Sequence, residues 1–459
     1  MDISAILTKQ EAFFYNGNTQ NINDRVKKLK QLMACIEKYE EEVLQALNLD
    51  FRKSAYEGYM TELSMVYLEL KNFIKNTSKW AKPKRVLQSI INFPAAEYLQ
   101  AQPFGKVLII APWNYPFMLA IQPLITAVAA GNVIVLKPSE LTPNTASVIK
   151  KIIEEVFEPD WVKVIEGDVE VTTKILEQRF AKIFFTGSTA VGKIVHQAAA
   201  KHLTPVVLEL GGKSPCVITA SANLEVAVKR IVFGKFVNGG QTCIAPDFIW
   251  IDEKIKDTFL KLLKSRIIEC YGEDIENNPD FPRIINAKNF NRLKSYLTNG
   301  TVYFGGQTNA DTNYIAPTVL DEVSFKDEVM QDEIFGPILP VLTFSTLQEV
   351  VKHNHETEKP LAFYIFSTDK KEIDYLQKNT QFGGGCVNDV LSHIINKRIP
   401  FGGFGNSGMG NYHGKFGFSA FTHTRGFVIR KNWLDIPIKY APYSNKMPIL
   451  KKFFALLKV

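Results

Sequence analysis

KVLIIAPW, residues 106–113, is a β-rich apolar run that ends in a turn. A helix is predicted from about 117 to 130, and a second apolar run, VIVLKP, follows at 133–138. Three more such runs come later, VKVIEG, AKIFFTGS and PVVLELGG, with helices starting near 142 and 189. Short apolar strands that alternate with helices predict an α/β fold, a parallel sheet covered on both faces.

The polar or glycine-rich ends of these strands read PWN, KPSE, FTGS and LELGG. Because ligands of such sheets bind beyond the carboxyl ends of the strands, we expect all four ends at one ligand-binding edge.

A second alternating series follows the turn GGKSP (211–215), which is a reasonable hinge. Helices are predicted from about 224 to 236 and from about 255 to 269. The strands predicted here are SPCVIT, DFIWI, TVYFG, PILPVLTF, LAFYIFS and GCVND. The series predicts a second α/β domain.

The segments outside these series are helical or extended. Apolar residues recur at helical spacing from Ile22 to Leu47, and a further helix is predicted from about 54 to 80. Residues 83–105 contain prolines and short extended pieces, so they predict an arm. The extended region 420–431 is expected to pair with that arm.

Length and composition narrow the class of protein. A chain of 459 residues predicts two or three domains, and a net charge of +7 is no nucleic-acid signature. Five cysteines with no CxxC and no metal-site spacing are typical of free thiols in a reducing cytoplasm. No secretory signal and no membrane-spanning apolar run is expected.

The loop VNGGQTCIAPD (237–247) contains the candidate nucleophile, Cys243. Two glycines allow a tight turn and close approach to a ligand, and a thiol in a polar loop can react if its thiolate is maintained. For a single cysteine, the simpler interpretation is a loop residue without a role. The other motifs therefore decide whether Cys243 is interpreted as a nucleophile.

Three features at the predicted sheet edge could bind an anionic cofactor. The turn from Gly187 through Ser188 to Gly192 precedes a helix, whose N–H groups suit a pyrophosphate. Lys137 could bind ribose hydroxyls or a phosphate, and Glu140 could accept from a ribose 2′-hydroxyl or repel a 2′-phosphate. Taken singly, a turn glycine and a solvated lysine explain these residues equally well.

Four further residues are candidates for chemistry. Glu209 lies inside an apolar strand, where a raised pKa suits a general base, although a salt-bridged core glutamate is the alternative. Asn114 could donate to an oxyanion or simply stabilise a turn. Glu333 and Phe335 pair an acid with an aromatic ring at the start of a strand, where ordinary structural roles would also explain them.

Together these motifs resemble the NAD(P)-dependent aldehyde dehydrogenases, and in particular their class three and fatty-aldehyde branch. The resemblance is carried, in the family's order, by PWNYP (112–116), KPSE (137–140), FTGSTAVG (185–192), LELGGKSP (208–215), GQTCIAPD (240–247), EIFGPILP (333–340), PFGGFGNSGMG (400–410) and NYHGKFGFSAFTH (411–423). It implies a Rossmann-type cofactor domain, a catalytic domain and a small oligomerisation arm. Residues 1–82 and 106–212 are expected to form the cofactor domain, and residues 213–419 the catalytic domain. Residues 83–105 and 420–435 are expected to form the oligomerisation arm, followed by a C-terminal tail at 436–459.

The resemblance also implies roles for individual residues. Cys243 would attack the aldehyde, Asn114 and the Cys243 N–H would hold the oxyanion, and Glu209 would activate water for thioester hydrolysis. The positions implied for NAD, with NADP as the alternative, are Trp113, Lys137, Glu140, Thr186, Gly187, Ser188, Gly192, Leu210, Glu333 and Phe335.

The branch further suggests a homodimer and a long apolar aldehyde, fatty or isoprenoid. Unlike the membrane-bound members of that branch, the chain is expected to have no hydrophobic C-terminal anchor. The basic amphipathic stretch at 449–459 could cap a substrate tunnel, touch a membrane surface or pack as a terminal helix. Three rival functions stay open: an acylating dehydrogenase that uses coenzyme A, a cysteine hydrolase without redox chemistry, and a binding protein that has lost the chemistry.

Overall fold

The computed structural model describes residues 2–456 and contains two compact units, residues 2–81 with 103–423 and residues 82–102 with 424–456. Its α-helices are α1 Ile3–Tyr15, α2 Ile22–Lys38, α3 Glu40–Phe51, α4 Ala55–Gly58, α5 Ser64–Ala81, α6 Met118–Ala130, α7 Pro143–Val156, α8 Val169–Leu176, α9 Thr189–Ala200, α10 Leu224–Phe236, α11 Lys256–Tyr271, α12 Ala287–Ser295, α13 Leu347–Glu356, α14 Lys370–Asn379, α15 Gly414–Ala420 and α16 Met447–Leu456.

Its strands are β1 Lys84–Arg85, β2 Ala95–Pro103, β3 Lys106–Ile110, β4 Val133–Lys137, β5 Val162–Val164, β6 Lys182–Thr186, β7 Val206–Glu209, β8 Pro215–Ile218, β9 Phe248–Asp252, β10 Thr301–Phe304, β11 Thr308–Asn309, β12 Tyr314–Ile315, β13 Thr318–Asp321, β14 Ile338–Phe344, β15 Ala362–Phe366, β16 Gly384–Val387, β17 Gly408–Met409 and β18 Thr422–Arg430. The α/β class is therefore confirmed.

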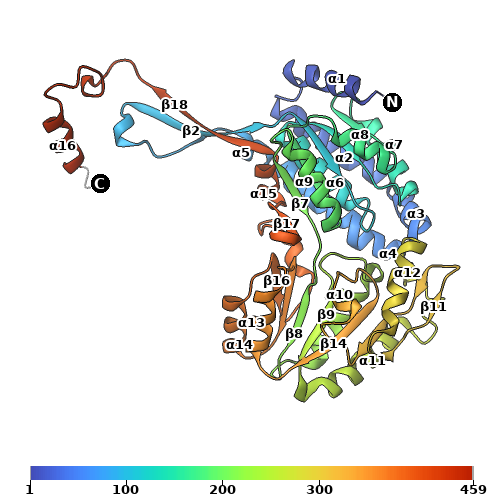
Figure 1. Cartoon of the computed structure of the whole chain (residues 1–459). Helices are drawn as coiled ribbons and strands as arrows, with labels where there is room; N and C mark the ends of the chain where they lie inside the picture. Colours follow the sequence, from blue (N-terminus) through green and yellow to red (C-terminus); the bar gives the residue numbers. More distant parts are fainter. Residues whose placement is uncertain (1, 457–459) are drawn as a thin grey trace. The chain divides into compact units, whose positions relative to one another are not determined.

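The first sheet has the order β17-β7-β6-β3-β4-β5, and its strands run parallel except for the short β17. Strands β3, β4 and β6 are almost fully buried, as expected when helices cover both faces. The first strand of this sheet in sequence, β3, leads into α6, and every residue of α6 is buried. Helix α6 lies between α2 and α9 in the view of Figure 1. The carboxyl ends of β3, β4, β6 and β7 lie at one edge, as the sequence predicted.

The second sheet has the order β10-β13-β14-β9-β8-β15-β16, and only β10 is antiparallel to its neighbour. Residues 210–214 connect β7 of the first sheet to β8 of the second (Figure 1). A predominantly aromatic and aliphatic core fills the space between the second sheet and its helices.

The segments outside the two sheets also agree with the prediction. The N-terminal region is helical, although a break at Tyr39 separates α2 from α3 and a π-helical turn (Tyr59–Leu63) precedes α5. The arm forms a three-stranded sheet in the order β1-β2-β18, which confirms the pairing of 83–105 with 420–431. This arm and the tail belong to one unit, whereas the proposed boundary at 212–213 falls inside the other unit and stays a prediction.

Several elements were not predicted: the helices α8, α12, α13, α14 and α15 and the short strands β11, β12, β13 and β17. Helix α8 begins at an Asp168 N-cap, whose carboxylate accepts from the N–H groups of Glu170 and Val171. Strand β17 has two residues and lies in a glycine-rich stretch, so it has no apolar period to detect. Within residues 2–456, no helix has both the length and the apolar character that a membrane span requires.

Candidate active site

Cys243 lies in the loop between α10 and β9, and left-handed backbone shapes this loop. Asn238 and Gly239 have φ values of 57° and 61°, and Gly240 has a φ of 74°. A Cβ atom on Gly240 would collide with the carbonyl oxygen of Gly336. The two glycines therefore make the predicted tight turn, and at Gly240 the close approach is to the protein's own backbone.

Two buried side chains fasten the loop on either side of Cys243. The Gln241 amide donates to the carbonyls of Asn238 (3.1 Å) and Arg283 (3.0 Å) and accepts from the Ile285 N–H (3.0 Å). The Tyr364 hydroxyl, from β15, donates to the Ile244 carbonyl at 2.6 Å. Because these groups are buried, each bond is costly to break, and the thiol is held in one position.

The turn after β3 meets this loop from the first sheet. Asn114 is buried, and its Nδ2 donates one hydrogen to the Gln241 carbonyl at 3.0 Å. An amide NH₂ has two hydrogens, so the second can be donated to another acceptor. The next residue, Tyr115, places its hydroxyl 2.6 Å from the Oγ1 of Thr242. The structure therefore brings Asn114 to the residues directly before Cys243.

Glu209, the last residue of β7, is buried, and neither of its carboxylate oxygens has a hydrogen-bond partner among the described residues. Burial raises the pKa of Glu209 well above its usual value. Strand β17 pairs with Glu209 through Gly408, so the glycine-rich motif at 400–410 covers this end of the sheet. Within residues 2–456 no cation lies within ion-pair distance of this carboxyl, so the alternative of a salt-bridged core glutamate is wrong.

Glu333 lies against the backbone that leaves the first sheet. A Cβ atom on Gly211 would collide with its carboxylate, so only glycine leaves room there. Burial raises the pKa of Glu333 to about 8, and the nearby Asp247 carboxylate acts in the same direction. Asp247 is itself held by the Lys213 ammonium (2.6 Å) and by the Ile334 N–H (2.9 Å).

The surroundings of Cys243 favour its thiol form. The side chain is partly exposed. Desolvation is the largest cause that raises the pKa of Cys243, and the nearby Glu333 and Glu209 carboxyls raise it further. Both carboxyls disfavour a negative charge on the nearby sulfur. The site therefore does not by itself maintain Cys243 as a thiolate. A group that accepts the thiol proton is needed for attack.

Comparison with known proteins agrees with this geometry. A sequence model of the aldehyde dehydrogenase family matches residues 1–427. The chain belongs to this family. It is 45% identical over 446 residues to the 4,4'-diaponeurosporen-aldehyde dehydrogenase of Staphylococcus aureus, covering 97% of both chains. It is 41% identical over 447 residues to the dimeric NADP-preferring aldehyde dehydrogenase of Canis lupus familiaris, covering 97% of this chain and 99% of that one.

Solved structures agree at the level of the whole fold. A Staphylococcus aureus AldH in a substrate-bound state superposes with a TM-score of 0.97 at 44% identity, covering 99% of this chain and all of that one. The family uses NAD(P), and the chain is therefore an aldehyde dehydrogenase with a nicotinamide cofactor.

The edge of the first sheet fits such a cofactor. The Thr186 hydroxyl at the end of β6 is buried without a hydrogen-bond partner in the described structure, so it can donate to a ligand. Ser188 caps α9, and Gly192 packs against Leu210, where a Cβ atom would clash. At the end of β4, the buried Lys137 ammonium lies 3.0 Å from the more exposed Glu140 carboxylate. These residues offer a helix N-terminus, hydroxyls and charge at one edge.

Two aromatic residues from the two sheets meet beside this edge. The rings of Trp113 and Phe335 lie 5.3 Å apart in an edge-to-face arrangement, and Phe335 has a left-handed φ of 53°. That conformation is uncommon for a residue with a large side chain, and it is typical of functional segments.

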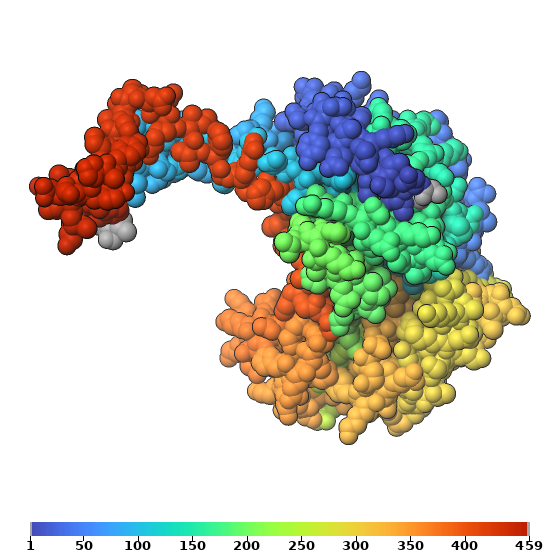
Figure 2. Space-filling view, turned by 45° about the horizontal axis from the view of Figure 1, so that its top comes forward, coloured from blue at the N-terminus to red at the C-terminus, as the bar shows by residue number. Residues whose placement is uncertain are grey.

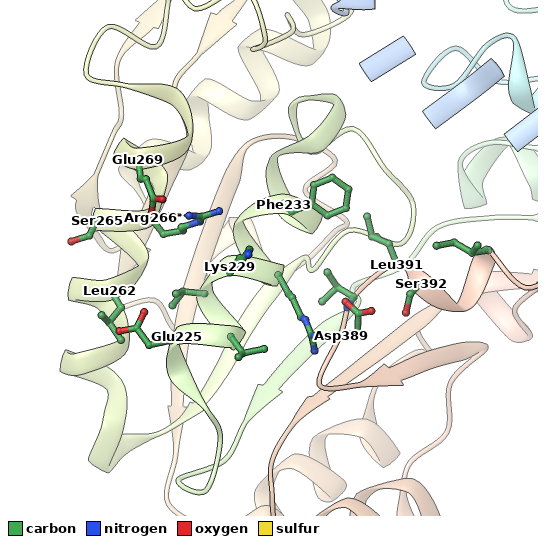
Figure 3. A pocket seen from close by; sticks show the side chains of 15 residues that line it. Glu225, Lys229, Phe233, Leu262, Ser265, Arg266, Glu269, Asp389, Leu391 and Ser392 are labelled. Carbon is green, nitrogen blue, oxygen red and sulfur yellow. Dashed lines mark hydrogen bonds and ion pairs between the residues drawn. The ribbon is translucent and has the colours of Figure 1, made fainter. Parts of the chain in front are cut away.

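A separate hollow of about 800 Å³ lies on the outer face of α10 (Figure 3). Its walls come from α10, α11 and the loop after β16, with Phe233 and Leu391 at one side. None of Cys243, Glu209 or Asn114 lines it. The hollow is therefore distinct from the candidate active site.

Several residues that build the site were not singled out from the sequence. They are Gln241, Thr242, Tyr115, Tyr364 and Asp247. A tyrosine inside an otherwise apolar strand, as at Tyr364, is a usable signal, because its buried hydroxyl requires a partner.

Proposed function

We propose that the chain oxidises an apolar aldehyde to the carboxylic acid through a covalent intermediate on Cys243. The supporting observation is that Cys243, the Asn114 amide and the unpartnered Glu209 carboxyl come together in one site. The reaction converts an aldehyde, water and NAD(P)⁺ into the acid, NAD(P)H and a proton.

The first step forms the bond between the Cys243 sulfur and the aldehyde carbon. The thiol proton passes to a base, and the carbonyl oxygen becomes an oxyanion. The free N–H of the Asn114 amide and the backbone N–H of Cys243 are proposed to hold that oxyanion. A tetrahedral, oxyanionic carbon releases its hydride readily, and bound NAD(P) supplies the hydride acceptor.

Loss of hydride leaves a thioester on Cys243. Glu209 is proposed to accept a proton from the water that attacks this thioester. The carbon–sulfur bond then breaks, which releases the acid and regenerates the thiol. A carboxyl with a raised pKa and no fixed partner among the described residues suits this role, because it can bind the water and is a stronger base than an ordinary carboxylate.

We propose NAD as the preferred cofactor, with NADP as the alternative. Glu140 would accept from a ribose 2′-hydroxyl and repel a 2′-phosphate, whereas Lys137 partly neutralises that carboxylate. Glu333 would accept from the nicotinamide ribose. Replacing Glu140 with Gln should raise kcat/KM with NADP relative to NAD, and an unchanged ratio would contradict the assignment.

We propose a long apolar substrate, fatty or isoprenoid, because the staphylococcal relative is named for an isoprenoid aldehyde. A homodimer is also proposed, since the canine relative is named as dimeric. The arm supports it: β18 is an edge strand with exposed Phe427, Val428 and Ile429, which is a template for pairing with a second copy. All five cysteines are free, which suits a reducing compartment such as the cytoplasm.

The test is NADH formation with NAD and aldehydes from short aliphatic through aromatic to long-chain. Turnover should rise with chain length, and Cys243→Ala should abolish it, whereas Cys270→Ala, an exposed free thiol, should not. Full activity of Cys243→Ala would refute the nucleophile. Glu209→Gln should give a burst of NADH followed by slow turnover.

The rivals predict different results in the same assay. Stimulation by coenzyme A would indicate an acylating enzyme. Ester cleavage unaffected by NAD would indicate a hydrolase, and binding of NAD without turnover of any aldehyde would indicate a protein that has lost the chemistry.

A further inference from the structure

Three charged side chains from the N-terminal helical region are buried beside the active-site loops. Lys53 follows α3, Glu57 lies in α4, and Glu62 lies in the π-helical turn before α5. The Lys53 ammonium pairs with the Glu62 carboxylate at 2.6 Å, and both side chains are fully buried. Burial of charge is costly, and replacing a buried ion pair by apolar residues is often neutral or stabilising. The remaining contacts of these groups therefore indicate what they do.

The same region also contacts the segment between α11 and α12. The backbone N–H of Arg283 donates to the Phe51 carbonyl at 2.9 Å, and the Arg52 guanidinium donates to the Glu276 carbonyl at 2.9 Å. Figure 2 shows N-terminal residues (blue) at the right of the molecule, next to residues near 300 (yellow). Side chains of this region can therefore reach loops that belong to either sheet.

Glu62 holds the turn that follows β3. Its Oε2 accepts from the backbone N–H groups of Phe117 (2.9 Å) and Met118 (3.2 Å), at the start of α6. The first N–H groups of a helix have no partner within the helix, and a carboxylate is favourable there. The Lys53 ammonium also lies 4.4 Å from the centre of the Tyr115 ring. The ion pair of Lys53 and Glu62 therefore fixes this turn from two sides.

Glu57 holds the Cys243 loop. Its Oε1 accepts from the backbone N–H of Asn238 at 2.9 Å. Asn238 has a left-handed φ of 57°, and its side-chain amide donates to the carbonyls of Asn114 (2.8 Å) and Gln241 (3.1 Å). The Gln241 carbonyl is also the acceptor of the Asn114 amide. Asn238 therefore connects the Cys243 loop to the turn after β3, and Glu57 fixes its backbone.

The Lys53 ammonium faces both carboxyls of this cluster. Desolvation raises the pKa of Glu57 to about 7, against the Lys53 ammonium and the Asn238 N–H, which lower it. The nearby carboxyls of Glu62 and Asp280 raise it further. When Glu57 is ionised, its bond to the Asn238 N–H is charge-assisted, and such a bond is roughly twice as strong as a neutral one. Lys53 and the Asn238 N–H therefore stabilise the charged form.

We propose that Glu57 is a positioning residue for aldehyde oxidation, which aligns the Cys243 sulfur with the Asn114 amide by holding Asn238. Within residues 2–456, Glu57 forms no hydrogen bond with Cys243 or Asn114, so it acts through the backbone that it fixes. The ion pair described above holds the opposing turn. The inference rests on the proposed function, because it assumes that Cys243 and Asn114 act on the same aldehyde.

The experiment measures kcat and single-turnover NADH formation by the purified chain with NAD and an aldehyde that it oxidises. Glu57→Ala leaves the Asn238 N–H without its partner and lets the loop shift, which should slow both rates by about 10- to 100-fold. The KM for NAD should change by less than about twofold, because the cofactor edge keeps its contacts. Glu57→Gln keeps an oxygen for the same N–H without the charge, so it should lose only about three- to tenfold.

A double-mutant cycle with Asn114→Ala separates positioning from general destabilisation. If Glu57 acts by placing the Asn114 amide, its replacement should slow the Asn114→Ala enzyme by less than about threefold, since the group that it aligns is already missing. Losses that multiply would overturn the proposal. If Glu57→Ala does not fold, the same cycle with Glu57→Gln decides.

The matched control is Glu40→Ala, which removes another carboxylate of the N-terminal helices and its 2.8 Å bond to the Tyr67 hydroxyl. This variant should lose stability in urea unfolding and keep its kcat within about twofold of the unmodified chain. An unchanged kcat in the Glu57 variants, or an equal loss in Glu40→Ala, would overturn the proposal. Failure of the proposed function looks different, because Cys243→Ala would then stay active. If this proposal alone fails, Cys243→Ala is inactive and the Glu57 variants keep their rates.

Discussion

Tyr364→Phe tests how Cys243 is held, because it removes one oxygen atom from β15 and changes almost nothing else in shape. The Tyr364 hydroxyl donates to the Ile244 carbonyl at 2.6 Å and accepts from the Leu391 N–H at 3.3 Å. Each bond contributes about 1 kcal/mol net, and a buried group left without a partner costs about 1–3 kcal/mol. We therefore expect the free energy of unfolding to fall by about 2–4 kcal/mol.

The same change should slow the reaction. Ile244 follows Cys243 directly, so release of its carbonyl lets the thiol move relative to Asn114. A displacement of this kind costs up to about 100-fold in rate, and it should appear in kcat more than in the KM for NAD.

The assay combines urea unfolding with steady-state turnover of an aldehyde. The control is Tyr67→Phe, which removes a 2.8 Å hydrogen bond from α5 to Glu40 on α3. That variant should lose stability and keep its kcat, which separates positioning from general destabilisation. A Tyr364→Phe enzyme with kcat within about twofold of the unmodified chain would refute the argument.

Three further predictions follow from the site. Gly240→Ala should destabilise the loop by at least about 1–2 kcal/mol from its left-handed φ alone, with a further loss from the clash with Gly336, measured by urea unfolding. Asn114→Ala should reduce kcat by about 10²–10³-fold with little change in cofactor KM, and equal loss in both would contradict an oxyanion role. Burial raises the pKa of Glu333 to about 8, so the folded state binds this proton more tightly than the unfolded state does. The contribution of Glu333 to the free energy of unfolding should therefore decline from about pH 4.5 to about pH 8. Glu333→Gln should make the measured decline shallower.

The sequence predicted most of the fold because its strands are apolar on both faces and short. Runs such as KVLII and KIFFT are stable only in the interior of a sheet that helices cover on both faces. In the structure both runs are buried strands of the first sheet, β3 and β6. The shortest elements that escaped prediction have no such period: β17 has two residues, and the break at Tyr39 interrupts a helical pattern that continues on both sides. The helices α12, α13 and α14 were missed as well, although they are long enough to show a helical period.

Prediction of the site was less complete. The strand ends at Thr186 and Glu209 were expected at one edge, since parallel strands bring their carboxyl ends together. The groups that hold Cys243 could not be assigned in the same way. Tyr364 lies 120 positions from its partner Ile244, and no local pattern connects them.

The sequence by itself determined the two sheets, the arm and the order of the motifs, because apolar periodicity and turn chemistry act over a few residues. Only the tertiary structure decided that the Asn114 amide reaches the Gln241 carbonyl, 127 positions away, and that Glu209 is buried without a partner. Such contacts depend on how the two sheets and their loops pack together. Their effects on pKa and on nucleophile position arise from burial, which exists only after that packing is complete.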